Sequence, residues 1–156
     1  QALPIRRAVG DPRDLAATLN TIGFTLVERD EFQPALAPYR EALDRWREAG
    51  DRSGEAATLH NLASISQSTG QYEEAIRLHE EALVLERATG FRVGEANTLS
   101  NLGRLYSNLG DPRRAVTLYE EALAVQRAAK RDDILHHRQA TLGAQALEDL
   151  LVHRDR

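Results

Sequence analysis

Amide-bearing side chains recur in one stretch of this sequence at the spacing of a single helix face. Asn97, Asn101, Arg104 and Asn108 lie three or four residues apart, which places them on one side of a helix that turns 100° per residue. An asparagine amide has two donor hydrogens and an acceptor oxygen, so it can bind the N–H and C=O groups of an extended peptide together. Arginine can pair with a carboxylate. The spacing therefore indicates a surface suited to peptide binding.

A 40-residue period organises the elements that must position these side chains. Residues 16–55 agree with residues 56–95 at 13 of 40 positions, and the next 40 residues agree with the latter at 14 of 40, against about 3 expected from composition. Within each period, apolar residues recur twice at i, i+3, i+4 and i+7, which is typical of amphipathic helices. A glycine, Gly70 or Gly110, separates the two stretches. Each period therefore predicts two antiparallel helices.

The predicted fold class is an all-α solenoid of stacked antiparallel helix pairs, forming a single array over residues 1–156. Leu142-Gly143 matches Leu102-Gly103 forty residues earlier, so we expect a closing helix of the first type at the end of the chain. We also expect small residues to lie where paired helices approach closely, at Gly23, Ala63 and Gly103. The expected units are a partial second helix at 1–10, repeats at 11–50, 51–90 and 91–130, and a C-terminal helix at 131–156.

The first helix of each repeat has a polar face opposite its apolar stripe. In the second repeat the stripe contains Leu59, Leu62 and Ala63, and in the third it contains the equivalent residues. The opposite faces supply the candidate ligand-binding residues, which are His60, Asn61, Ser64, Ser68, Asn97, Asn101, Arg104 and Asn108.

Two arguments bear on whether these polar faces bind a ligand. Each asparagine costs a helix roughly 0.5–0.7 kcal/mol relative to alanine, and neither Lys nor Glu occurs among the four residues from Asn97 to Asn108. Asn61 and Asn101 are equivalent residues one repeat apart, and packed helices lie roughly 8–10 Å apart, close to the length of three extended residues. The two amides could therefore grip one strand at matching intervals. The alternative interpretation is a solvated helix face without a ligand.

Composition excludes several classes of protein. The formal charge is −4 and the pI is about 5.7, which argues against a nucleic-acid partner because such proteins carry a basic stripe. The chain has no cysteine, so disulfides and thiolate metal sites are excluded. No apolar run approaches the ~18 residues that cross a bilayer, and no secretory leader opens the chain. We therefore expect no membrane partner and a cytoplasmic location.

The histidines do not form a catalytic or metal-binding pattern. His60 and His79 lie on different predicted helices, and His79 is in the column that Tyr39 and Tyr119 fill in the other repeats, so we expect it to pack between helices. His-Glu-x-x-His spacing, clustered carboxylates and a Gly-rich phosphate loop are absent, which excludes the common metal and nucleotide motifs. We expect no enzyme activity, no metal and no cofactor.

The motif residues of the third repeat resemble those of a tetratricopeptide repeat. The family pattern of an apolar residue, Leu-Gly, an aromatic, Gly-Asp, Ala, an aromatic and Ala-Leu is matched here by Leu99, Leu102-Gly103, Tyr106, Gly110-Asp111, Ala115, Tyr119 and Ala122-Leu123. The resemblance covers nearly the whole chain. The 40-residue period, in place of the usual 34, is similar to that of kinesin light chains and of multidomain bacterial regulators.

The resemblance implies a right-handed superhelix whose inner wall, made by the first helix of each pair, binds a peptide or protein segment. In related repeats an asparagine commonly contacts the ligand backbone at the position of Asn61 and Asn101, whereas Thr21 departs from the pattern. The family's carboxylate clamp needs a lysine near His60 or Asn20, and none is present. The resemblance therefore disfavours a receptor for chaperone tails.

The expected function is a protein-interaction module that binds a peptide or protein segment in the concave groove. Arginine outnumbers lysine 19 to 1 and methionine is absent, so we expect a fragment of a larger bacterial signalling or regulatory protein. Two alternatives stay open. One is a structural or self-associating module without a groove ligand, with a homo-oligomer formed through outer faces or exposed ends. The other is an accessory domain that controls an attached enzyme.

Overall fold

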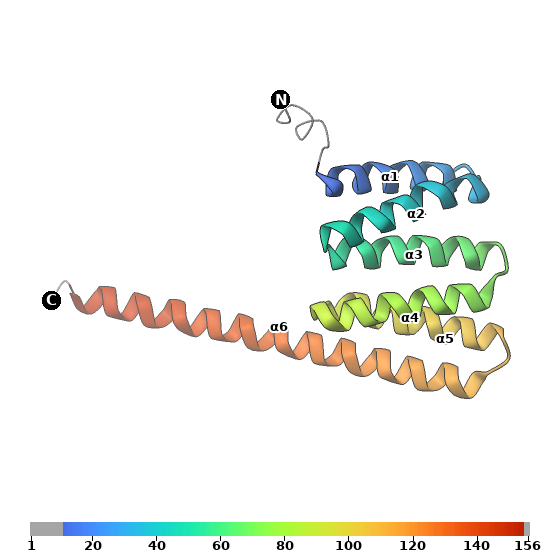
Figure 1. Ribbon diagram of the computed structural model, residues 1–156. Coiled ribbons are helices and arrows are strands. Elements are labelled where there is room, and N and C mark those ends of the chain that lie inside the picture. Colours follow the sequence, from blue (N-terminus) through green and yellow to red (C-terminus); the bar gives the residue numbers. More distant parts are fainter. Residues whose placement is uncertain (1–10, 155–156) are drawn as a thin grey trace, which may run out of the picture.

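In the part of the chain that the structure describes, six helices form a stack of antiparallel pairs (Figure 1). The computed structural model describes residues 11–154, with the side chains of residues 11–135, 138 and 139. Every element in this part of the chain is helical, as the all-α prediction requires, and the predicted partial helix at 1–10 lies outside the described residues. The helices are α1 (Pro12–Val27), α2 (Phe32–Ala49), α3 (Arg52–Ser68), α4 (Tyr72–Thr89), α5 (Arg92–Asn108) and α6 (Pro112–Arg154).

The turns explain where the helices end. Gly50 and Gly90 follow α2 and α4 with φ of 65° and 71°, a left-handed conformation that glycine adopts without the steric cost of a Cβ. Gly70 and Gly110 take the same conformation inside the second and third repeats. In the first repeat Asp30 occupies the equivalent position at φ 59°, which aspartate tolerates better than most residues. The turn geometry is therefore kept although the glycine is lost.

Close packing within each pair depends on small residues, as the sequence predicts. A Cβ placed on Gly23 would lie 2.8 Å from the Tyr39 ring, and one placed on Gly103 would lie 2.9 Å from the Tyr119 ring. Two buried clusters fill the interior. One spans α2 to α4 (Ala35, Tyr39, Leu43, Leu59, Leu62, Ala63, Ile65, Leu78 and Ala82), and the other spans α4 to α6 (Ala75, Ile76, Leu83, Leu99, Leu102, Leu105 and Ala122).

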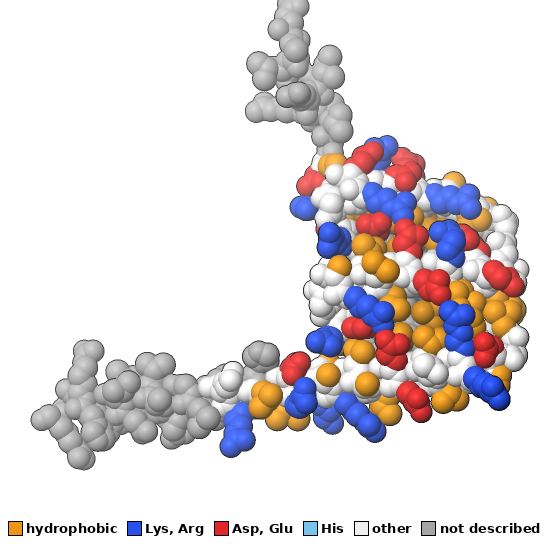
Figure 2. All heavy atoms as spheres, turned by 60° about the horizontal axis from the view of Figure 1, so that its bottom comes forward, with side chains coloured by type: hydrophobic (Ala, Val, Ile, Leu, Met, Phe, Trp, Pro, Cys, Tyr) orange, Lys and Arg blue, Asp and Glu red, His pale blue; other side chains and the backbone are white. Residues whose placement is uncertain are grey.

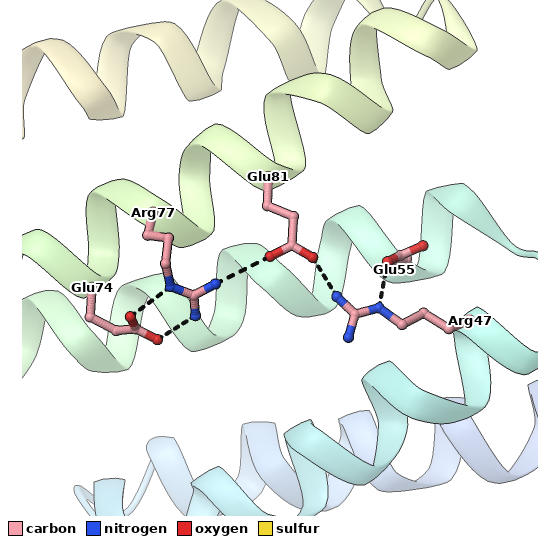
Figure 3. A network of polar contacts seen from close by, with 5 residues as sticks. All are labelled: Arg47, Glu55, Glu74, Arg77 and Glu81. Atoms are coloured by element: carbon pink, nitrogen blue, oxygen red, sulfur yellow. Dashed lines mark hydrogen bonds and ion pairs between the residues drawn. The ribbon is translucent and has the colours of Figure 1, made fainter.

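An arginine at the end of each second helix ties neighbouring repeats together. The Arg47 guanidinium donates from Nε to Glu55 at 2.7 Å and also bonds Glu81 of α4, as Figure 3 shows. Arg87 repeats the arrangement with Glu95 at 2.9 Å and with Glu121. Each guanidinium thus bonds carboxylates on both helices of the next repeat. The sequence shows this arginine column, but the column alone did not reveal the role.

The end of the chain differs from the sequence prediction. We expected a separate closing helix from residue 131, whereas α6 continues without a break from Pro112 to Arg154. The junction residues explain the difference. Lys130 stands where the earlier repeats have Gly50 and Gly90, and Leu135 stands where they have a glutamate that pairs with the arginine. Without the glycine that stops the helix and the carboxylate that anchors the next one, α6 continues past the array.

Candidate functional site

A groove of about 590 Å³ lies between α3 and α5, with side chains of α4 at its floor. Helices α3 and α5 supply its polar walls, and Ala56, Ala57 and Phe91 add apolar surface. α3 and α5 begin within two residues of the left-handed glycines Gly50 and Gly90, which set their direction. The full lining is Arg52, Ser53, Ala56, Ala57, His60, Ser64, Gln67, His79, Glu86, Thr89, Phe91, Gly94, Asn97, Asn101 and Arg104.

The groove brings together five of the eight residues expected from the sequence. These five are His60, Ser64, Asn97, Asn101 and Arg104. The other three are Asn61, Ser68 and Asn108, and they are not part of this lining. Ser68 and Asn108 are the last residues of α3 and α5 and are exposed to solvent, whereas Asn61 is half-buried. The expected face is therefore divided: its central part lines the groove and its C-terminal part does not.

A chain of hydrogen bonds crosses the floor of the groove. His60 Nε2 lies 2.8 Å from Glu86 Oε1, and His60 Nδ1 lies 3.2 Å from His79 Nδ1. His79 Nε2 lies 2.9 Å from the Gln67 side-chain nitrogen. The Gln67 oxygen then accepts from Arg104 at 2.8 Å. The chain joins α3, α4 and α5 and ends on the arginine of the groove wall.

One arrangement of protons satisfies every member of this chain. Glu86 is 2 % exposed, and as a carboxylate it accepts from His60 Nε2–H and from the Thr98 hydroxyl at 2.7 Å. His60 Nδ1 then accepts from His79 Nδ1–H, and His79 Nε2 accepts from the Gln67 amide. Because buried polar groups cost free energy unless they are bonded, this arrangement stabilises the floor with His79 neutral.

The electrostatics of the floor keep His79 neutral. Burial, and to a smaller extent the neighbouring His60 and Arg104, lower the pKa of His79 to about 4. Protonation would place an N–H on His79 Nε2, facing the amide hydrogens of Gln67. His79 is thus an interhelical residue, as the sequence predicted, but its buried contacts include hydrogen bonds as well as packing.

Arg104 lies at the rim of the groove with its direction constrained. Its Nη2 donates to the Gln67 oxygen at 2.8 Å and lies 3.4 Å from Asn101 Oδ1. The residue is exposed to solvent, so its remaining N–H groups can meet a ligand. A guanidinium has five donors in a planar fork that fits a carboxylate. The arrangement can therefore hold a negatively charged group at one end of the groove.

Sequence reasoning missed the floor of this groove. Glu86 aligns with Trp46 and Gln126 in the other repeats, and these three residues share no apolar character that would predict burial. In the structure Glu86 is buried against Thr98, and the Trp46 ring packs on Gly54, where a Cβ would lie 2.3 Å from the indole. The available signal was the change of residue type within one column, from tryptophan to an acid beside two histidines.

Two structural findings bear on other kinds of site. Among the described residues, no group of three His, Cys, Asp or Glu side chains is placed to hold a metal ion. In the same part of the chain, no helix combines the length and the apolar character needed to cross a bilayer.

Comparison with known protein families identifies the repeats. Two models described as tetratricopeptide repeat match the chain, one over residues 54–128 and the other over residues 15–49. The chain belongs to the tetratricopeptide repeat family. This confirms the resemblance seen in the sequence, and members of the family form folds that generally mediate protein–protein interaction. No curated protein sequence matches the chain at the significance we required.

Solved tetratricopeptide structures share the fold at low sequence identity. The TPR domain of Arabidopsis FLU is 21% identical with a TM-score of 0.68, and the match covers 75% of this chain and 98% of that domain. BtubC from P. vanneervenii is 23% identical with a TM-score of 0.68, covering 74% of this chain and 48% of the other. A putative kinesin light chain from P. anserina is 21% identical with a TM-score of 0.62, covering 76% and 58%. The likeness to kinesin light chain repeats agrees with the expectation from the sequence.

Proposed function

We propose that this tetratricopeptide array binds an extended peptide segment of a partner protein along the groove between α3 and α5. The observation that carries the proposal is the arrangement of His60, Ser64, Asn97, Asn101 and Arg104 around one groove of about 590 Å³. The composition fits a fragment of a larger bacterial signalling or regulatory protein. In such a protein the array would act as the module that recognises the partner.

The chemistry of the walls supports an extended backbone as the ligand. Asn97 and Asn101 lie one helical turn apart on α5, and each amide can donate to a peptide carbonyl while accepting from a peptide N–H. Asn97 is exposed and Asn101 is half-buried, so ligand hydrogen bonds would replace hydrogen bonds to water. Phe91, Ala56 and Ala57 offer apolar surface to ligand side chains.

Arg104 supports a preference for an acidic residue at one end of the ligand. Its guanidinium is fixed by Gln67, and through Gln67 by the two histidines of the floor. A charged donor that is already oriented loses less entropy when it binds a carboxylate than a free side chain does. We therefore expect an aspartate, a glutamate or a terminal carboxylate opposite Arg104.

The backbone grip proposed for Asn61 and Asn101 now rests mainly on Asn101. Asn61 is half-buried and lies outside the lining of this groove. Ser68 and Asn108 are also outside it, so contacts from these three residues would require a ligand that extends beyond the groove. We place the centre of binding at Asn97, Asn101 and Arg104.

A peptide-display selection against the chain tests the proposal. Selected peptides should bind the Asn101→Ala and Arg104→Ala variants about 5- to 150-fold more weakly, since each loses contacts worth about 1–3 kcal/mol. Asn108→Ala is the matched control, because it removes the same amide from the same helix outside the groove, and it should bind normally. Equal loss in all three variants, or no change in any of them, would contradict groove binding, and a failed selection would favour a scaffold without a groove ligand.

A further inference from the structure

One face of α6 is exposed where the same face of the preceding second helix is covered. Val116, Tyr119 and Leu123 are 54%, 42% and 45% exposed, and Figure 2 shows hydrophobic side chains at the surface along this helix. The equivalent residues of α4 are 9%, 2% and 8% exposed (Ile76, His79 and Leu83). Ile76 and Leu83 are covered by α5, whereas His79 is bonded to α3 of its own pair. Within the part of the chain that the structure describes, this face of α6 therefore lacks the covering helix that α4 has.

The sequence continues this face through the rest of α6 with a period of seven residues. Positions of this kind form the contact seam of paired helices when they are apolar. The two columns of the seam are Val116, Leu123, Lys130, His137, Ala144 and Leu151, and Tyr119, Gln126, Asp133, Ala140 and Leu147. Both columns are apolar at their two ends and polar in the middle.

The second half of α6 has no partner helix within the described part of the chain. The first half of α6 packs against α5 and is bonded to α4 through Arg87 and Glu121, whereas its second half leaves the stack (Figure 1). Ile134 and Leu135 are 58% and 49% exposed at the point where α6 leaves the array. A single helix in water is only marginally stable without packing, so this half is stabilised most simply by another helix.

We propose that α6 pairs antiparallel with α6 of a second copy of this chain. In this register Leu123 lies opposite Leu147 of the second copy, and Tyr119 lies opposite Leu151. The apolar first half of each seam then covers the apolar second half of the other, on both sides of a two-fold axis near residue 135. The second copy supplies the cover that the next repeat supplies to α4.

Charge decides between the antiparallel and the parallel pair. In the antiparallel register Asp133 lies opposite His137 of the second copy, so an acid meets a base at the polar centre. In a parallel pair Lys130 would face Lys130 and Asp133 would face Asp133, and like charges across a seam are destabilising. The antiparallel arrangement also holds the two arrays at opposite ends of the pair, which leaves both grooves open.

Molar mass tests whether the pair forms. Sedimentation equilibrium over a concentration series should give twice the chain mass, falling to the single-chain mass in Leu123→Glu and in Leu151→Glu. Leu151 lies outside the repeats, so Leu151→Glu should leave the array folded. This variant therefore tests the pair even if Leu123→Glu misfolds. Val84→Glu is the matched control, because Val84 is 67% exposed on α4, and this variant should stay dimeric. A single-chain mass for the unaltered protein would overturn the proposal.

Crosslinking tests the direction of the helices. The chain has no cysteine, so Gln126→Cys and Ala144→Cys can be made as separate variants that leave the apolar layers in place. A short bismaleimide should crosslink the mixture of the two variants and neither variant alone. Crosslinking within each single variant would indicate a parallel pair, and no crosslinking in the mixture would show that residues 126 and 144 of two copies do not meet in this register. Either result would overturn the proposal.

Discussion

His60 and His79 face each other through their Nδ1 atoms at 3.2 Å, across the contact between α3 and α4. Only one of the two nitrogens can carry the proton of this hydrogen bond. Because Arg104 donates to the Gln67 oxygen, the Gln67 amide N–H faces His79 Nε2 and donates to it. His79 Nδ1–H then donates to His60 Nδ1, and His60 Nε2–H donates to Glu86. The position of the proton on His79 Nδ1 thus links the buried Glu86 carboxylate to Arg104 at the groove wall.

The first prediction concerns the pH dependence of stability. The folded state holds the pKa of His79 at about 4, against the usual 6.5, so between these values the unfolded chain binds a proton that the folded chain does not. The free energy of unfolding should therefore fall as the pH drops from 6.5 to 4, by up to about 3 kcal/mol, and should be insensitive to His79 above this window. Urea unfolding measures it, and His79→Tyr should reduce the loss because tyrosine fills this column in the other repeats. An equal loss in both proteins would exclude His79 as the cause.

The second prediction concerns the buried carboxylate. Glu86→Ala removes the acceptor for His60 Nε2–H and for the Thr98 hydroxyl, which leaves two polar groups without their partner. We expect a loss of about 3 kcal/mol in the free energy of unfolding, and a smaller loss for Glu86→Gln, whose amide oxygen still accepts. Glu120→Ala, at an exposed position of α6, is the control and should change stability by less than about 0.5 kcal/mol. A loss for Glu86→Ala no larger than the control's would refute the network.

The third prediction compares two glycines that face tyrosines. Gly23→Ala should destabilise the fold by about 1–3 kcal/mol, because its methyl group would lie 2.8 Å from the ring of Tyr39, which is only 1% exposed and has no room to move. Gly103→Ala should cost less, because Tyr119 is 42% exposed within its own chain and is held less tightly there than Tyr39. Thermal or urea unfolding of the two variants checks the order, and the opposite order would contradict this account of the packing.

The fourth prediction concerns the continuity of α6. Lys130→Gly restores the glycine that ends α2 and α4. Leu135→Glu restores the carboxylate that anchors the following helix, and Arg127 is the arginine available to pair with it, as Arg87 pairs with Glu95. We expect this double variant to bend α6 after residue 130. Spin labels at residues 113 and 150 should then lie much closer together within one chain than the roughly 55 Å of a continuous helix. An unchanged distance would show that these two residues do not decide where α6 ends.

Much of the fold follows from the sequence because its determinants are local and repeated. Apolar spacing defines the helices, the glycines define most turns, and small residues such as Gly103 mark the close contacts within pairs. The central part of the groove lining also followed from the sequence, because residues three and four apart share one side of a helix wherever that helix packs.

The tertiary structure alone decided the floor of the groove and the length of α6. Gln67 lies on α3, whereas His79 and Glu86 lie on α4. The hydrogen bonds of the floor therefore form only once α3, α4 and α5 are stacked. Whether Asn61 or Asn101 lines the groove likewise depends on how neighbouring repeats sit, which a helical wheel does not contain. The end of α6 depends on competition between continuing a helix and packing its next segment, and that balance is set by contacts between repeats, not by periodicity within them.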